Sequence, residues 1–360
     1  MDVKSYFANK LSKMLFLEIK KENIKKLFNA EIKEDIYFPV KASNIVDKVK
    51  AETNLEQIPI SFFVEGMTYV LGADENFRFN GYYEKLICNI KDSNNFIKSK
   101  IAEYVKNEDY EEAYILLKGL LRIEDTIEIY DKLITIVDNL RNSDKMYKSE
   151  ELEVIEKAKN KENYAPPYFY EALIRREEGD YDKALFCINN YISRGGKETL
   201  EITEFKHELK SIIDFEKGKE MVYDAPKEAL KFLIPLIEEF GDNATLHYYI
   251  AIAYRILENY EKAIYYLNDA MSIDSNIIEV VNELGINHAS LGNYETAIAY
   301  FRKAFEATKS VEICTNIIMC YLNAGDIKNA KLHLDIAKKL DPKDEIVIEL
   351  EGIINNSQAD

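Results

Sequence analysis

The sequence predicts an all-α protein in which antiparallel helix pairs stack into a solenoid. A short motif recurs along the chain and ends each time in alanine, at Ala113, Ala184, Ala263, Ala297 and Ala330. The last three of these alanines are spaced by 34 and then 33 residues, a period typical of repeat proteins. Apolar residues around them recur at helical spacing, so each copy predicts two amphipathic helices. One such pair cannot cover its own apolar faces, and a neighbouring pair must do so.

Residues 279–304 show how one copy predicts a helix pair. Leu284 and Gly285 lie on one face of the first helix, and Ala297 and Phe301 share a face of the second. Gly292 separates the two helices, because glycine accepts the left-handed backbone conformation that ends many helices. The small side chains at 285 and 297 predict that the two helices pack closely.

The array is expected to extend beyond the clearest copies. A weaker copy surrounds Ala229, with Pro226 at the head of its second helix, a position where proline is tolerated. An eroded copy is expected between 126 and 163. The predicted organisation is therefore about seven helix pairs over 94–342, best matched over 244–342.

The two ends of the chain lack the period. Residues 343–354 predict a helix that caps the last apolar face of the array, followed by a tail over 355–360. Residues 1–93 predict a small irregular helical region of unknown type. Its expected helices cover residues 4–29, 43–52, 60–71 and 80–91, with an irregular stretch near residues 34–40.

Charge and cysteine content restrict the class of protein. The 360 residues carry a net charge of −17, which argues against nucleic acid as the main partner. Residues 1–50 are the exception, with 11 Lys and 7 Asp or Glu. Four widely spaced cysteines without a CxxC pair indicate reduced thiols. With no signal-peptide pattern and no apolar run of membrane-spanning length, a cytoplasmic protein is expected.

The copies resemble the tetratricopeptide repeat (TPR) family. Over 244–342, Leu284-Gly285-x-x-His288 precedes Ala297, Phe301 and Ala304, and the copies on either side follow the same pattern. The chain departs from the family in having no Trp. Where the family often has Trp, it has His247, Val281 and Cys314. The resemblance implies a right-handed solenoid whose first helices line a concave groove for a peptide or protein segment.

Counting back from the marker alanines selects first-helix side chains for that groove. The expected binding residues are Phe169, Arg176, Tyr248, Arg255 and Asn282, together with Asn316 and Asn323, which lie next to the counted positions. Side-chain amides can both donate to and accept from a peptide backbone, and Arg255 could bind a carboxylate. In the alternative interpretation these side chains are merely solvated. Asn282→Ala and Arg255→Ala are expected to leave folding within about 0.5 kcal/mol of the parent.

No catalytic or metal-binding pattern emerges from the sequence. The four histidines lie about 40 residues apart and form no metal-binding pair. Gly195-Gly196-Lys197 lacks the earlier glycine of a phosphate-binding loop, since Tyr191 stands there. Glu111 and Glu112 are expected on a solvated helix face. We therefore predict no enzyme activity, no metal and no cofactor.

The leading hypothesis is a non-catalytic TPR scaffold that binds a protein segment or peptide. The alternative is a bacterial peptide-sensing regulator with a helical effector head and a TPR sensor body. A third hypothesis places residues 11–28 on a membrane surface as a basic amphipathic helix. The expected partner is a protein or peptide, with nucleic acid and a membrane span not expected.

Overall fold

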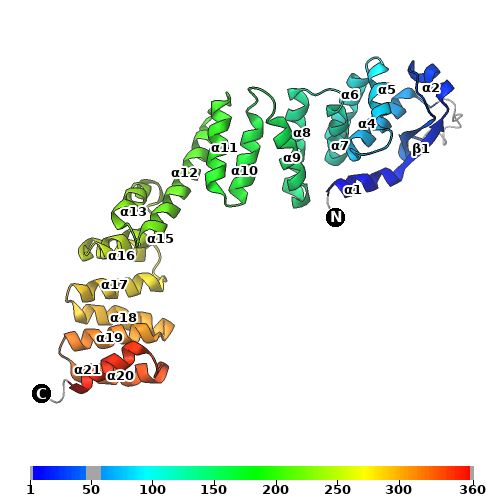
Figure 1. Cartoon of the computed structure of the whole chain (residues 1–360). Coiled ribbons are helices and arrows are strands. Elements are labelled where there is room, and N and C mark those ends of the chain that lie inside the picture. The colour runs from blue at the N-terminus through cyan, green and yellow to red at the C-terminus, as the bar shows by residue number, and fades with distance from the viewer. Residues whose placement is uncertain (1–2, 46–57, 357–360) are drawn as a thin grey trace. The chain divides into compact units, whose positions relative to one another are not determined.

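The chain divides between Lys206 and His207 into two compact units, each built mainly of helices (Figure 1). The structure, a computed structural model, describes residues 3–45 and 58–356. The expected helix over 43–52 lies largely outside these residues, as do positions 357–360 of the expected tail.

The N-terminal end of the first unit contains a small antiparallel sheet. Its elements are α1 (Val3–Lys10), β1 (Met14–Ile19), α2 (Lys21–Phe28) and β2 (Ile36–Lys41). The strands pair with Met14 opposite Lys41 and Ile19 opposite Ile36. The prediction of one helix over 4–29, and of an irregular stretch near 34–40, was therefore wrong. The membrane-surface helix over 11–28 is wrong for the same reason.

Strand pairing explains that error. Residues 11–28 carry apolar side chains at near-helical spacing, but aromatic and β-branched residues also fit a strand when a partner is available. The partner strand lies about twenty residues downstream, where a local pattern cannot reveal it. Asn29 then ends α2 in the left-handed conformation, with φ of 49°.

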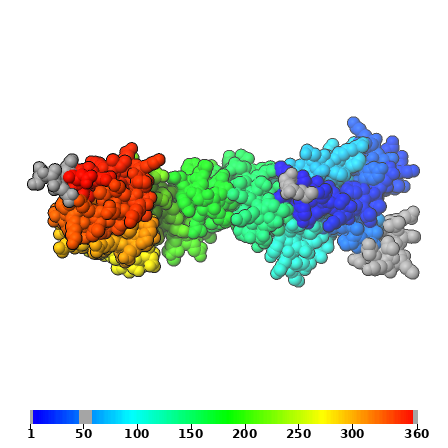
Figure 2. Space-filling model, turned by 90° about the horizontal axis from the view of Figure 1, so that it is seen from below, coloured from blue at the N-terminus to red at the C-terminus, as the bar shows by residue number. Residues whose placement is uncertain are grey.

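One hydrophobic core joins this N-terminal segment to the helices that follow. It runs from Val3 to Tyr164, and Figure 2 shows the blue segment lying directly against the cyan helices. The expected helices over 60–71 and 80–91 are present as α4 (Ile60–Ala73) and α5 (Asn80–Asn89). Helix α4 packs directly on α7, because a Cβ at Gly72 would lie 1.8 Å from the Ile115 carbonyl oxygen.

Helix pairs continue through the first unit. They are α6 (Ser93–Lys106) with α7 (Tyr110–Leu121), α8 (Ile127–Ser143) with α9 (Lys148–Ala158), and α10 (Pro166–Glu177) with α11 (Tyr181–Ser193). Helix α12 (Leu200–Met221) crosses the division between the units.

The second unit repeats the same arrangement. Its helices are α13 (Pro226–Leu233), the short α14 (Ile237–Phe240), α15 (Ala244–Ile256), α16 (Tyr260–Ile273), α17 (Ile278–Ser290), α18 (Tyr294–Thr308), α19 (Val311–Asn323), α20 (Ile327–Leu340) and α21 (Glu345–Asn356). Pro226 stands at the head of α13, as expected.

The packing expected within a copy is present in α17 and α18. A Cβ added at Gly285 would lie 2.6 Å from the Phe301 ring, so only glycine lets these helices approach so closely. Ala297 and Ala304 are fully buried. Gly292 has a φ of +78°, the left-handed conformation predicted for the turn.

Helix α21 covers the end of the second unit. Val347, Leu350 and Ile354 are buried in the core that α17–α20 share. The helix includes Asn355 and Asn356, so these two residues are not part of a tail. The domain boundaries expected at 93, 342 and 354 stay predictions.

Candidate functional site

The first helices of the second unit form the inner side of its stack. Helices α15, α17 and α19 contact one another in succession, whereas α16, α18 and α20 approach one another less closely. In a curved stack the closer-spaced helices lie on the inner side. A strip of side chains on α15, α17 and α19 therefore forms the candidate site, and we call it the first-helix strip.

All seven residues selected from the sequence are at least partly exposed. Five of them lie on the first-helix strip: Tyr248 and Arg255 on α15, Asn282 on α17, and Asn316 and Asn323 on α19. Phe169 and Arg176 lie on α10 in the other unit. The structure thus places five of the seven on successive helices of one unit.

Arg255 is already paired within the protein. Its Nε lies 2.7 Å from Oε2 of Glu283 on α17, and the two side chains are 26% and 10% exposed. Burial raises the pKa of Glu283, while the guanidinium opposes that rise. Glu283 therefore neutralises the charge of Arg255. A partner's carboxylate, which the sequence suggested for Arg255, would compete with Glu283 for the guanidinium.

Tyr248 packs against α17 and against other aromatic rings. It contacts the cluster that contains Val280 and Leu284 of α17. Burial raises the pKa of its hydroxyl, and the charge of Glu283 acts in the same direction. Its ring packs edge-on against Tyr249, with centroids 5.3 Å apart. Tyr249 in turn packs edge-on against Phe215 of α12. Tyr248 thus lies between the aromatic rings of Tyr249 and Phe215 and the helix α17, which carries Glu279 and Glu283.

Two buried amide oxygens of α17 have no hydrogen-bond partner among the described residues. They are Asn282 Oδ1 and Asn287 Oδ1. Such atoms cost free energy when buried unless something satisfies them. Arg255 Nε and Glu283 Oε2, by contrast, lie 2.7 Å apart and satisfy each other as an ion pair.

Glu279 and Glu283 were not among the binding residues expected from the sequence. The signal was available, because the two residues are four apart and so share a face of one helix. Counting back from the marker alanines samples only two positions of each first helix, and neither position is 279 or 283.

Phe169 and Arg176 occupy an aromatic environment on α10. The Phe169 ring lies 5.8 Å from that of Tyr191. The Arg176 guanidinium lies 5.6 Å from the Phe205 ring, at cation–π distance. Both residues therefore contribute to packing in the first unit.

A second opening lies on first helices of the first unit. A cavity of about 520 Å³ lies between α6 and α8, lined mainly by Ile101, Val105 and Ile136. Lysines stand at its rim, and Lys98 and Lys132 are paired with glutamates. The sequence did not reveal it, because the copy that supplies α8 is eroded.

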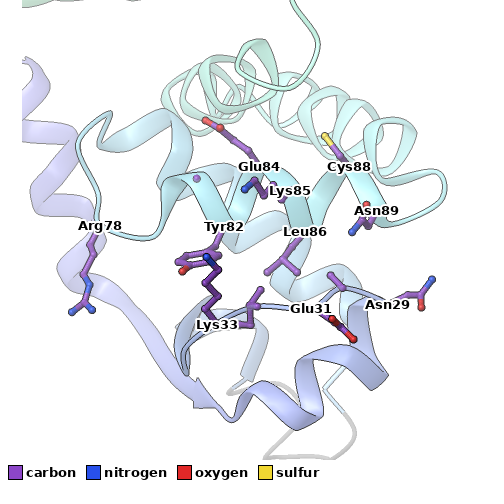
Figure 3. A pocket seen from close by; sticks show the side chains of 13 residues that line it. Asn29, Glu31, Lys33, Arg78, Tyr82, Glu84, Lys85, Leu86, Cys88 and Asn89 are labelled. Carbon is purple, nitrogen blue, oxygen red and sulfur yellow. The ribbon is translucent and has the colours of Figure 1, made fainter.

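A larger depression of about 980 Å³ lies near the N-terminus, between residues 29–33 and α5. Figure 3 shows its labelled side chains, with Arg78 pointing away from the others. Arg78 is instead paired with Glu34 at 3.0 Å. The lining mixes acidic and basic side chains without convergence on one point, so it indicates no particular ligand.

The expectation that Glu111 and Glu112 of α7 lie on a solvated helix face was wrong. They do not form a solvated face, because Lys10 contacts both of them and Lys41 lies 2.7 Å from Glu112. The Tyr69 hydroxyl also donates to Glu112 over 2.9 Å. Burial acts to raise the pKa of each glutamate, but the lysines and hydroxyls outweigh it and lower the pKa. These two carboxylates bind α1 and β2 to α7.

Metal and membrane sites were also sought. Within residues 3–45 and 58–356, no group of three or more His, Cys, Asp or Glu is placed to hold a metal ion. No helix in the same residues is both long and apolar enough to cross a membrane.

The family model for the tetratricopeptide repeat matches residues 278–310, which span α17 and α18. This copy contains Gly285, Ala297 and Ala304, whose close packing between the two helices was expected from the sequence. Residues 278–310 are therefore similar to the tetratricopeptide repeat. The fold is all-α, built of stacked antiparallel helix pairs, with one two-stranded sheet among the described residues of its N-terminal segment.

Several solved structures overlap this chain at low sequence identity. The structure described as YrrB, a TPR protein with an unusual peptide-binding site, is 19% identical, with 56% of this chain and 99% of that chain covered and a TM-score of 0.38. A MamA structure is 17% identical, with coverages of 49% and 91% and a TM-score of 0.37. The Cut9–Hcn1 structure is 13% identical, with coverages of 87% and 66% and a TM-score of 0.38. No protein with a curated description matches the sequence.

Proposed function

We propose that this chain is a non-catalytic, cytoplasmic TPR scaffold that binds an extended protein segment along its first-helix strip. The observation that carries the proposal is that the partly exposed side chains Tyr248, Asn282 and Asn316 stand on three successive first helices. A peptide backbone presents donors and acceptors at regular intervals and can satisfy such groups.

Within the strip, Asn282 and Tyr248 are the main expected contacts. Asn282 is half-buried, and its Oδ1 has no partner among the described residues, so it can accept from a backbone N–H. Tyr248 offers part of an aromatic ring, which gives apolar contact area at low entropic cost. Asn316 and Asn323 extend the strip along α19.

The test uses the full-length chain and a display library of random peptides with blocked termini. Peptides that bind should lose affinity by about tenfold, or about 1.4 kcal/mol, in Asn282→Ala or Tyr248→Ala if these are hot spots. The matched control is Asn268→Ala, an exposed asparagine on the second helix α16. Failure to select any peptide, or equal effects of Asn282→Ala and Asn268→Ala, would contradict the proposal.

No observation in the described residues favours the peptide-sensing regulator with a helical effector head at residues 1–93. Lys10 and Lys41 give that segment part of its basic character, yet both are paired with glutamates of α7. The same segment shares a continuous core with the helix pairs. It is therefore built as a part of the scaffold.

A further inference from the structure

The first-helix strip and the opposite face of the second unit differ in charge. Helices α15, α17 and α19 together carry one basic residue, Arg255, and three acidic residues, Glu279, Glu283 and Glu312. Helices α16, α18 and α20 carry seven basic and five acidic residues. The acidic face is thus the one on which the partner is expected.

The acidic charge of the strip is not neutralised from within. Arg255 is occupied by Glu283. Glu279 and Glu312 are both exposed, and neither forms an ion pair with any residue that the structure describes. They stand at equivalent positions of successive copies, 33 residues apart, and so repeat the same negative charge along the strip.

An aromatic ring and apolar side chains lie on the same helices. Tyr248 packs against the cluster that contains Val280 and Leu284 of α17, the sequence neighbours of Glu279 and Glu283, and an aromatic face next to a carboxylate attracts a cation. Further along, Met319 is 46% exposed, and Ile286 and Leu322 are half-buried. The strip therefore offers a site for a cation followed by apolar contacts.

Glu283 contributes little to that negative charge. Its Oε2 lies 2.7 Å from Arg255 Nε, so the two side chains neutralise each other. The exposed carboxylates of Glu279 and Glu312 therefore carry the charge of the strip.

We propose that the strip selects a protein segment carrying a lysine or arginine side chain, followed by apolar residues, rather than an acidic segment or a C-terminal carboxylate. The cation binds the exposed carboxylate of Glu279 beside the Tyr248 ring, and the apolar residues contact Ile286 and Met319. This inference rests on the proposed function, because it specifies the partner of the same surface.

The acidic residues have a competing structural explanation. Glu279 and Glu312 stand in the first turns of their helices, where a carboxylate stabilises the helix dipole. Glu261 and Glu295 stand at the same position of the second helices α16 and α18 and are also exposed. The variant Glu261→Gln/Glu295→Gln is therefore the matched control for Glu279→Gln/Glu312→Gln.

The experiment selects random peptides with blocked termini on the full-length chain and on both double variants. We expect enrichment of Lys or Arg at a fixed distance from apolar residues. A selected peptide should bind Glu279→Gln/Glu312→Gln at least about threefold more weakly, and the loss should shrink in high salt, as for exposed charge pairs. The control variant should bind like the parent.

The outcomes separate this inference from the proposed function. Peptides that depend on Asn282 but show no basic preference, or an acidic one, would overturn the inference and leave the proposed function intact. A basic preference that is equally strong in Glu279→Gln/Glu312→Gln would also overturn it. Selection of no peptide at all would count against both.

Discussion

The turn between the helices of a copy requires a left-handed residue, and the copies fill that position differently. Gly179, Gly292 and Gly325 adopt it with φ of 77–78°, whereas Glu108 and Glu258 adopt it with φ of 62° and 59°. The backbone hydrogen bonds around Glu258 match those around Gly292, with both the turn residue and its successor bonded to the preceding helix. A side chain in this conformation carries a steric cost that glycine avoids.

Glu258→Gly should therefore stabilise the second unit. The expected gain is about 0.5–1 kcal/mol, since the relief of the left-handed strain exceeds the entropic cost of glycine. The measurement is the midpoint of urea unfolding, with Gly292→Glu as the opposite change, expected to lower it. A midpoint that stays equal or falls for Glu258→Gly would show that the turn holds no strain.

The pair of Arg255 and Glu283 changes the loss of stability that we expect when Arg255 is substituted. Removing the guanidinium leaves the carboxylate of Glu283 buried, so Arg255→Met should cost about 2–3 kcal/mol at pH 7.5 rather than the small change expected from sequence. The folded-state pKa of Glu283 is already raised and rises further without Arg255. In the variant, the folded protein then binds a proton on Glu283 that the unfolded chain does not bind. The loss of stability caused by Arg255→Met should therefore shrink as the pH falls towards 5.

Unfolding of Arg255→Met and of the parent at pH 7.5 and pH 5 checks this prediction. A loss that is equal at the two pH values would mean that Glu283 does not depend on Arg255.

At the scale of elements, the contact between the helices of one copy limits side-chain size. Ala297 on α18 is fully buried, and Gly285 on α17 leaves room for nothing larger than hydrogen beside Phe301. Ala297→Leu should overpack this contact and lower the free energy of unfolding by about 1–3 kcal/mol. Ala299→Leu, at an exposed position of the same helix, should change it little. Equal thermal stabilities of the two variants would contradict the helix phasing.

The docking of β2 on α7 depends on one lysine. Lys41 contacts Glu112 at 2.7 Å and Glu65 at 3.4 Å, and the Glu65 side chain is 3% exposed. Lys41→Met should therefore cost about 3–5 kcal/mol, because it leaves the buried carboxylate of Glu65 without a cation. Lys13→Met, at an exposed lysine of the same segment, should cost little. Unfolding followed by circular dichroism measures both, and similar losses would show that Lys41 does not join these elements.

The same contacts predict acid sensitivity. The pKa values of Glu111 and Glu112 are lowered in the folded protein, so the stability they contribute is present above their ordinary pKa and is lost as the pH falls below it. In Lys41→Met, whose Glu112 has lost its main cation, this loss between pH 5 and pH 3 should be smaller than in the parent. A steeper acid loss in the variant would contradict this assignment of charges.

At the scale of the whole molecule, the parts that sequence could predict are those with a local, repeated cause. Ala297, Phe301 and Gly292 encode the helix pair directly, because helical spacing and a left-handed turn need no distant partner. The sheet of β1 and β2 depends on pairing across the chain, so residues 14–19 gave a misleading local pattern. The pair of Arg255 and Glu283 joins two copies, and a count within each copy could not find it.

The central claim is that a partner segment lies along α15, α17 and α19. The most direct test places a photoreactive group in a display-selected peptide, cross-links it to the full-length chain and maps the attached residues by mass spectrometry. The account predicts attachment around Tyr248, Asn282 and Asn316, on three successive first helices. Attachment confined to α16, α18 and α20, or to the depression between residues 29–33 and α5, would contradict it.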